Sequence, residues 1–474
     1  MATDRLRSLA IAAVLGLGST GCAASMARTD LARIRSLTEM PIPQDLGPVD
    51  VEIAAEVEDL LARPLDVDTA VQVAILNNRA LRATLRELGI ERGMLIDARS
   101  VPNPTVEVEL LPERQTELEL RIEYEISELI LAPLRAKVAR FELDEARYRA
   151  AAEVVLLGYR VRAAYRKMQA AHERLAVAQR RLDALAAARD AAVALGQAGS
   201  VNELESASQI VVYERARVGV ASLELELADR REALQRLLGL FGEHAGWQLG
   251  EPLPAIPAEL PGVDNLETVA VERSFELAAG RSRLEAIAHR TGLERTEGWL
   301  PEIAVDYHAL IGDPTAMPND GDGRWRSGAG ISVAVPLFNQ NRGKTRAAEA
   351  EFDGQFERYI GASVDVRSAA REVENRVRSA HGTARHLGAV VLPAQQRVLD
   401  ETLLQYNAMQ LGVFELLAAE QALLDVQLAE LEARADYWVA HAALEALQAG
   451  GQPEFDRMRG GASLDRSNPS RGDH

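Results

Sequence analysis

The sequence predicts a mainly α-helical protein with four membrane-type β-strands, built as two copies of one plan. Short motifs recur at a fixed distance. Gly89–Arg92 (GIER) returns as Gly292–Arg295 (GLER), and Pro133–Leu134 returns as Pro336–Leu337, each 203 residues further along the chain. A period near 200 residues indicates a duplicated domain rather than a solenoid of short units.

Composition favours long, closely packed helices and argues against a nucleic-acid partner. Of the 474 residues 47% are hydrophobic and only 4% are aromatic. The net charge is -18 and the pI is about 5.1. Phosphate contact needs a basic face, and none stands out here. We therefore expect no nucleic-acid partner.

The first residues have the pattern of an export signal. Arg5 and Arg7 precede a short apolar core, and small residues lead into Cys22, the only cysteine. This pattern predicts a signal peptide over residues 1–21 and lipidation of Cys22, although Ser19 stands where leucine is usual. The other interpretation is an ordinary signal with an incidental thiol. No later apolar run approaches 18 residues, so any membrane crossing after export must use strands.

Two segments near residue 100 alternate between apolar and charged residues, as a half-buried β-hairpin does. One face would carry Val106, Val108, Leu110, Leu118, Leu120, Ile122, Tyr124 and Ile126. The other face would carry Glu107, Glu109, Glu117, Glu119, Arg121, Glu123 and Glu125. If the apolar face meets lipid, the charged face must line a pore. A soluble half-buried sheet would show the same alternation.

The second copy repeats the hairpin over about residues 301–337. Its apolar residues are Ile303, Val305, Tyr307 and Ala309 in one strand and Trp325, Ala329, Ile331, Val333 and Val335 in the other. Four strands have exposed edges and are too few to close a barrel. Three chains would supply twelve strands, an even number that bacterial barrels use. We therefore expect an oligomer that pools its strands.

Long helices follow each hairpin. Residues 137–195 contain no proline and lead through a glycine turn to a returning helix over 201–238. The second copy has a helix over 344–411, broken or kinked near Pro393, and a return over 413–447. Each copy begins with another amphipathic segment, 66–99 or 266–297. A generic coiled coil would share these features.

The chain resembles the TolC-like outer-membrane efflux protein family over its mature length. The residues that carry the resemblance are the Asn103–Pro104 and Leu300–Pro301 strand starts, the segment Val333–Gly343 (VAVPLFNQNRG) and the segment Tyr406–Gln421 (YNAMQLGVFELLAAEQ). The PLFNQNRG part is similar to the cobalt-zinc-cadmium branch. The chain departs from the family at Met409, where many members have glycine.

The resemblance implies an architecture and a set of partners. It implies a homotrimer whose twelve-strand β-barrel crosses the outer membrane above a periplasmic α-barrel of long helical hairpins. It implies a passive duct for substrate from an inner-membrane resistance-nodulation-division pump, passed on by a periplasmic adaptor. The hairpin tips would contact the adaptor through Gly199, Glu203, Leu204, Gly412, Val413, Phe414, Glu415 and Leu416. The alternative is a periplasmic coiled-coil structural or adaptor lipoprotein without a pore.

No catalytic constellation competes with this interpretation, so we expect no enzyme activity, cofactor or metal site. Gly343-Lys344-Thr345 lacks the earlier glycine of a phosphate-binding loop. His381 and His386 are five residues apart and do not share the spacing of a metal pair. The expected divisions are a signal peptide (1–21), a lipid-anchored segment (22–64), the first repeat (65–241, hairpin about 103–131), a linker (242–264), the second repeat (265–448) and a disordered C-terminal tail (449–474).

Overall fold

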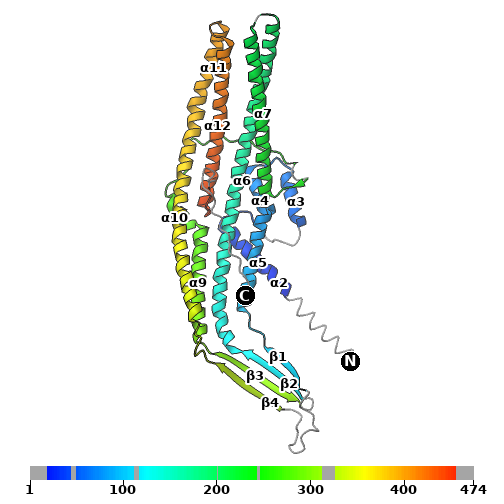
Figure 1. The fold of residues 1–474 in the computed structure, drawn as a ribbon, viewed down its shortest axis with the longest axis vertical. Helices are drawn as coiled ribbons and strands as arrows, with labels where there is room; N and C mark the ends of the chain where they lie inside the picture. The colour runs from blue at the N-terminus through cyan, green and yellow to red at the C-terminus, as the bar shows by residue number, and fades with distance from the viewer. Residues whose placement is uncertain are drawn as a thin grey trace, which may run out of the picture.

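The computed structural model describes residues 19–43, 50–111, 117–199, 201–242, 246–311 and 326–454. The molecule is a long rod with a β-sheet at one end and the tips of two helical hairpins at the other (Figure 1). Within the described ranges, no helix is both long enough and apolar enough to cross a membrane.

The sheet joins the strand hairpins of the two repeats. β1 (Thr105–Leu111) and β2 (Glu117–Glu125) form the first hairpin, and β3 (Glu302–Ile311) and β4 (Arg326–Ala334) form the second. All neighbours are antiparallel and the order is β1-β2-β3-β4, so the repeats meet where β2 pairs with β3. β1 and β4 are left as the open edges of this sheet.

In the described ranges before residue 105, four helices precede the first hairpin. They are α2 (Ser19–Thr38), α3 (Asp50–Leu61), α4 (Val67–Asn77) and α5 (Arg79–Arg99). The Asp66 side chain accepts from the Thr69 amide and caps α4, and Asn78 caps α5 in the same way. Asp30 of α2 is buried and accepts hydrogen bonds from Arg92 of α5 and Arg147 of α6. These contacts fix α2 to the first repeat.

The first long hairpin consists of α6 (Ile126–Gln197) and α7 (Glu203–Leu238). α6 has 72 residues and begins directly after β2, eleven residues earlier than the predicted start at 137. The predicted hairpin limit at residue 131 is therefore wrong, and Ile126 belongs to the helix. Pro133 lies inside α6 near its start. The missing N–H of Pro133 leaves the Leu129 carbonyl without its usual helical donor. Arg135 donates to the adjacent Glu128 carbonyl in the same turn.

The second repeat has the same plan with two short helices before the strands. α8 (Leu266–Arg273) and α9 (Phe275–Trp299) are stacked end to end, as α4 and α5 are. After the strands follow α10 (Arg342–His386), the π-helix η3 (Leu387–Val391), α11 (Leu392–Asn407) and α12 (Val413–Gln448). The interruption predicted near Pro393 is the π-helix. There the Leu392 amide donates to the Leu387 carbonyl, five residues earlier, whereas an α-helix would use the carbonyl four residues earlier.

Each repeat has its own main core, which supports the duplication. One cluster of buried side chains comes almost wholly from residues 31–247, and a second comes from residues 263–447. Tyr165 is fully buried in the first cluster, and its hydroxyl donates to the Leu65 carbonyl at 2.6 Å. Phe275 and Ala446 of the second repeat join the first cluster, so the two cores are in contact.

The segment expected to be a linker is a packed strap that crosses three long helices. Gln169 of α6 donates to the Glu251 and Pro252 carbonyls, and Trp438 of α12 donates to the Pro254 carbonyl. His381 of α10 lies 3.0 Å from the Pro257 carbonyl. Prolines cannot donate backbone hydrogen bonds, so this extended segment offers carbonyls that side chains of α6, α12 and α10 use.

The beginning of the expected disordered tail is ordered. The Gly450 carbonyl accepts from the Phe275 amide at 2.9 Å, and the Gly451 amide donates to Ala446. Gly450 has φ +91°, and an added Cβ would lie 2.4 Å from the Arg273 carbonyl oxygen, so only glycine fits this turn. The prediction of disorder is therefore wrong for 449–454, and residues 455–474 lie outside the described part.

Candidate functional site

The strand register places the apolar and charged residues of the first hairpin on opposite faces of the sheet. Val106 pairs with Ile122 and Val108 pairs with Leu120, whereas Glu107 pairs with Arg121. Because directly paired residues point to the same side, the expected division into two faces is confirmed. The remaining pairs of the charged face are Thr105 with Glu123, Glu109 with Glu119 and Leu111 with Glu117.

The charged face is exposed and mostly acidic. Glu107, Glu109 and Glu125 are exposed and Glu123 is partly buried. Arg121 lies 3.4 Å from Glu119 on its own strand, so one of the negative charges has a partner. Glu117 belongs to β2, but its side chain falls outside the described part of the chain.

β3 extends this face with two residues outside the predicted pore-lining set, Asp306 and His308. Asp306 pairs with Glu123, and His308 pairs with Arg121. The Asp306 carboxylate lies 3.3 Å from Nδ1 of His308. Their signal was present in the sequence, because both residues alternate with Val305, Tyr307 and Ala309.

Glycines on β4 make room for these two side chains. Gly330 pairs with Asp306 and Gly328 pairs with His308. A Cβ at Gly330 would lie 2.4 Å from an Asp306 carboxylate oxygen, and one at Gly328 would lie 2.6 Å from Nε2 of His308. The side chains of β3 therefore lie across β4, where a larger residue would displace them.

The first helical tip is capped on both sides of its turn. Gly199 has φ +72°, the left-handed conformation that glycine adopts without a Cβ penalty. Asn202 starts α7 with a capping box, since its side chain accepts from the Glu205 amide while the Glu205 side chain reaches the Asn202 amide. Glu203 and Leu204 follow this cap and are exposed at the end of the rod.

The second tip uses a different residue in the left-handed conformation. Gly412 has φ -85°, whereas Met409 has φ +60°. At the end of α11 the Met409 amide donates to the Tyr406 carbonyl, and the Gln410 amide donates to the Gln405 carbonyl. The Met409 side chain is 94% exposed. Val413 and Glu415 are also exposed, Leu416 is partly buried, and the Phe414 side chain is not described.

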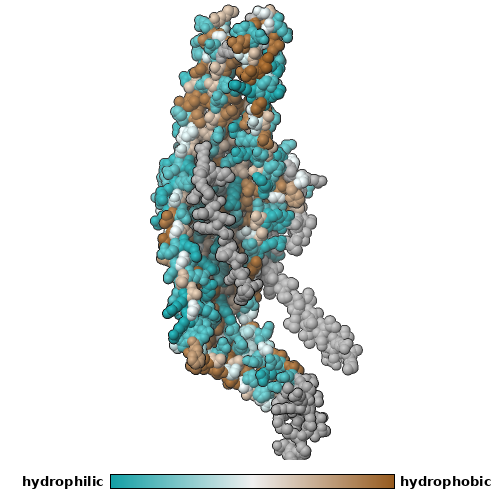
Figure 2. Space-filling model, in the orientation of Figure 1, coloured by the Kyte–Doolittle hydropathy of each residue, from teal (hydrophilic) through white to brown (hydrophobic). Residues whose placement is uncertain are grey.

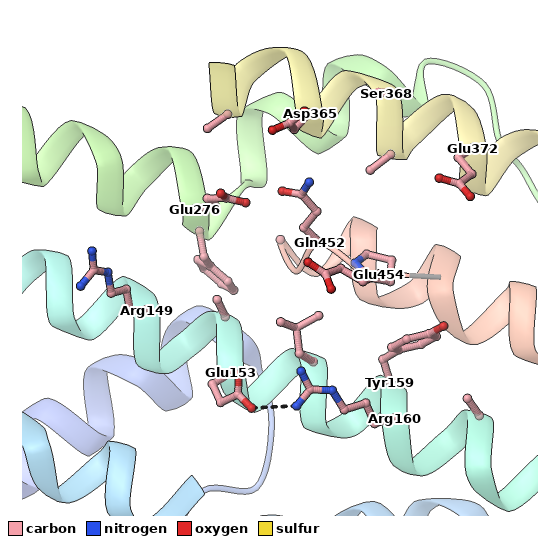
Figure 3. Close-up of a pocket in the computed structure, with 18 of the residues that line it drawn as sticks. Arg149, Glu153, Tyr159, Arg160, Glu276, Asp365, Ser368, Glu372, Gln452 and Glu454 are labelled. Atoms are coloured by element: carbon pink, nitrogen blue, oxygen red, sulfur yellow. Dashed lines mark hydrogen bonds and ion pairs between the residues drawn. The ribbon is translucent and has the colours of Figure 1, made fainter. Parts of the chain in front are cut away.

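A polar cavity of about 1540 Å³ lies between the two repeats, bounded by α6, α7, α9, α10, α12 and residues 450–454. Figure 3 shows Glu276, Asp365 and Glu454 approaching one another across this cavity. Burial raises the pKa of Glu276, and the nearby negative charges of Asp365 and Glu454 raise it further. Elsewhere in the cavity Glu153 and Arg160 form an ion pair at 2.9 Å.

The described residues contain no group of three or more His, Cys, Asp and Glu side chains placed to hold a metal ion. His381 is buried against the strap and Tyr437, with ring centroids 5.6 Å apart. The candidate lipidation residue Cys22 lies in α2, and its side chain is outside the described part. Lys344 of the GKT motif lies at the start of α10, and its Nζ is 3.9 Å from a carboxylate oxygen of Glu294 in α9.

Comparisons with known proteins agree with this architecture. Residues 268–450 match the family described as outer membrane efflux protein. The cobalt-zinc-cadmium resistance protein CzcC of Cupriavidus metallidurans is 25% identical over 386 residues, which cover 77% of this chain and 86% of that protein.

Solved structures share the fold at lower identity. The structure of CusC has a TM-score of 0.63 at 19% identity, covering 81% of this chain and 92% of CusC. The outer membrane protein VceC of Vibrio cholerae has a TM-score of 0.66 at 16% identity, covering 84% of this chain and 97% of VceC. With the two-hairpin sheet and the paired long helices, these matches show that the chain has the fold of outer membrane efflux proteins, and that its residues 268–450 match that family.

Proposed function

We propose that this protein is the outer-membrane duct of a tripartite efflux system and exports substrate passively. The observation that carries the proposal is the four-stranded sheet, which has one apolar face, one charged face and two open edges. Such a sheet suits a membrane barrel, because strands there alternate between lipid and lumen. The long hairpins extend from it as the wall of a periplasmic tunnel.

The open edges of β1 and β4 support a homotrimer. A membrane does not tolerate unpaired strand edges, so each sheet must find partners. Three copies give twelve strands, and pairing of β1 with β4 of the next copy closes the ring. The alternative of a poreless periplasmic adaptor lipoprotein leaves these edges and the apolar face without a function.

The hairpin tips are the proposed docking sites for a periplasmic adaptor, which connects the duct to an inner-membrane pump. They lie at the end of the rod opposite the sheet (Figure 1). Gly412 offers a clean test, because only the flexible Glu415 side chain lies near the position of an added Cβ. Gly412→Trp should impair export and leave trimer assembly intact, and normal export would count against this docking site.

The proposed location is the outer membrane, with Cys22 acylated and the helices extending into the periplasm. Several acyl chains on Cys22 would add firm anchoring to that of the barrel. Mass spectrometry of the N-terminal peptide should then show a diacyl or triacyl cysteine at residue 22.

Heavy-metal cations are the proposed cargo. The match to a cobalt-zinc-cadmium resistance protein supports this class. The acidic strand face supports it too, since carboxylates in a lumen attract cations more than anions. No fixed metal site is required for a duct, in which substrate passes without being held.

Planar-bilayer recording of the purified protein tests the duct itself. We expect stable open-channel steps, with a conductance that does not depend on an energy source. Deleting the gene should lower resistance to cobalt, zinc or cadmium in the bacterium that carries it, with little change for organic toxicants. A protein that inserts without conducting would overturn the duct, whereas loss of resistance to organic compounds alone would overturn only the cargo.

A further inference from the structure

Asp306 and His308 place two metal-type ligands side by side on the charged face of the sheet. Oδ2 of Asp306 and Nδ1 of His308 are 3.3 Å apart. The two side chains are 26% and 41% exposed, so solvent reaches both. Imidazole nitrogen and carboxylate oxygen are ligands that Zn²⁺ and related divalent cations accept. The pair therefore has the chemistry of a cation site and is open to the aqueous side of the sheet.

The spacing of the two ligand atoms suits a shared metal ion. A direct N–H···O hydrogen bond usually spans about 2.7–3.2 Å, which is shorter than the 3.3 Å observed. Zn²⁺ binds histidine nitrogen and carboxylate oxygen at about 2.0–2.2 Å in tetrahedral geometry, which sets two ligand atoms about 3.3–3.5 Å apart. The distance between the two atoms therefore need not change when an ion binds.

The neighbouring charges favour a cation at this position. Asp306 is paired directly with Glu123 of β2, and like charges directly opposite each other destabilise a sheet. Arg121 is the partner of His308, but its guanidinium lies 3.4 Å from Glu119, on the side away from Asp306 in the strand register. A cation between Asp306 and His308 would thus have Glu123 beside it and would relieve the repulsion of the two carboxylates.

The glycines of β4 determine where the pair lies. Gly328 and Gly330 are the β4 partners of His308 and Asp306. An added Cβ at Gly328 would lie 2.6 Å from Nε2 and 2.7 Å from Cε1 of His308, so the ring occupies space that only glycine leaves free. Figure 2 shows hydrophilic and apolar surface side by side at this end of the rod. The position of the ring therefore depends on β4 and not on charge alone.

We propose that Asp306 and His308 form a transit site for a divalent transition-metal cation such as Zn²⁺ on the lumen face of the sheet. His308 Nδ1 and one Asp306 oxygen bind the ion, the ring proton then lies on Nε2, and water completes the coordination shell. Two protein ligands hold an ion more weakly than the three or four of resident zinc sites, which suits an ion that must leave again. The inference rests on the proposed duct and names the residues that contact its cargo.

Titration of the K⁺ current with divalent cations in planar bilayers tests the site. A bound Zn²⁺ adds positive charge to the wall, so at low salt Zn²⁺ should reduce the K⁺ current more than Mg²⁺ does at the same concentration. Mg²⁺ screens charge equally, but it prefers oxygen ligands and keeps its waters. Equal effects of the two ions on the native protein would overturn the site.

Removal of the imidazole should abolish this difference between the ions. In His308→Gln the half-blocking Zn²⁺ concentration should rise at least about tenfold, because even loss of a group that supports a metal ligand commonly has an effect of this size. His386→Gln is the matched control, since His386 is an exposed histidine of α10, away from the sheet. An equal loss of Zn²⁺ sensitivity in this control would place the bound ion elsewhere and contradict the assignment.

Gly328→Ala separates metal binding from general electrostatics. It keeps every charge of the face, but its Cβ displaces the His308 ring. Zn²⁺ sensitivity should therefore fall as in His308→Gln, while the cation-to-anion permeability ratio without Zn²⁺ stays native. Gly361→Ala on α10 is the control, because an added Cβ there meets nothing within 4 Å. Full Zn²⁺ sensitivity in Gly328→Ala would reject the site in favour of diffuse attraction by the acidic wall.

Zinc-soaked crystals give a measurement that does not need conduction. Anomalous scattering at the zinc edge should show a peak between His308 and Asp306 in the native protein and none in Gly328→Ala. Native crystals without this peak would overturn the site even where conductance and export confirm the duct. A peak in a protein that neither conducts nor exports would support the cation site and reject the proposed function.

Discussion

Glu276, Asp365 and Glu454 bring three carboxylates into the cavity between the repeats (Figure 3). They come from α9, α10 and the segment after α12, and the cavity that they line lies between the two repeats of the chain. Their repulsion therefore acts at the junction of the two repeats. None of the groups that shift the pKa of Glu276 is a cation, and all of them act in the same direction. The ionised form of Glu276 is therefore less favourable in the folded protein than in the unfolded chain.

This arrangement predicts a pH dependence of stability. A carboxyl with a raised folded pKa contributes stability that is complete below its unfolded pKa, about 4.5, and is lost as pH rises through the higher folded value. Glu276→Gln should therefore raise the free energy of unfolding at pH 7 by about 0.5 kcal/mol, a small value because solvent screens this partly exposed group. Thermal unfolding followed by circular dichroism should show the gain at pH 7 and none at pH 4.

The exposed Glu56 on α3 supplies the control, since Glu56→Gln should change stability little at either pH. A Glu276→Gln protein that is less stable than the native one at pH 7 would show that the carboxylate has a stabilising partner instead.

The two helical tips reach the same form with different residues. The turn after α6 uses Gly199 in the left-handed region, whereas the turn after α11 uses Met409. A side chain with a Cβ costs about 1–2 kcal/mol in this conformation, and glycine loses about 0.5–1 kcal/mol more backbone entropy on folding. The second tip is therefore the more strained of the two.

Met409→Gly should relieve this strain by a net 0.5–1 kcal/mol, roughly. Tip residues open locally, so the gain should appear as amide hydrogen exchange slowed by about two- to fivefold over residues 405–412. Gly412→Ala is the matched control, because φ at Gly412 is -85° and nothing is relieved there. Faster exchange in Met409→Gly would mean that the methionine side chain holds the turn through contacts.

Alternation and periodicity were sufficient to predict the strands, their two faces and the long hairpins. Glu107 and Val108 had to face opposite sides because the backbone of a strand alternates, whatever surrounds it. Strong helix formers and a lack of proline predicted the length of α6 well at its far end, but not its start, where Pro133 is tolerated close to the first turn.

Other features left little trace in the sequence. The strap of residues 251–258 is held through its backbone carbonyls, which every residue has, so its composition resembles that of a loose linker. The positive φ of Met409 depends on the way α11 ends and not on a preference of methionine. The inter-repeat carboxylates come from residues up to 178 positions apart, Glu276 and Glu454, and only the fold brings them together.

At the scale of the whole molecule, the acidic charge of the sheet lies at one end of the rod and the docking tips at the other (Figure 1). The charged face includes Glu107, Glu109, Glu123 and Asp306, and its described cation, Arg121, lies next to Glu119. A ring of three copies would repeat this excess of negative charge around the lumen. Mobile ions screen such charges over about 8–10 Å near physiological salt, so the field acts near the wall and weakens toward the pore axis.

Charge removal on this face should lower cation preference. We expect the native protein to pass cations more readily than anions at low salt, as measured by reversal potentials in planar bilayers under a salt gradient. In a variant with Glu107, Glu109, Glu123 and Glu125 changed to Gln, the cation-to-anion permeability ratio should fall toward one. Glu119 is retained because Arg121 already offsets it.

The variant Glu56→Gln/Glu58→Gln, altered on α3 away from the sheet, should keep the native ratio. The difference should shrink as salt is raised, since screening then removes the field in the native pore as well. A native ratio of one, or a ratio unchanged by the four substitutions at low salt, would leave these glutamates with only the task of keeping the lumen hydrated.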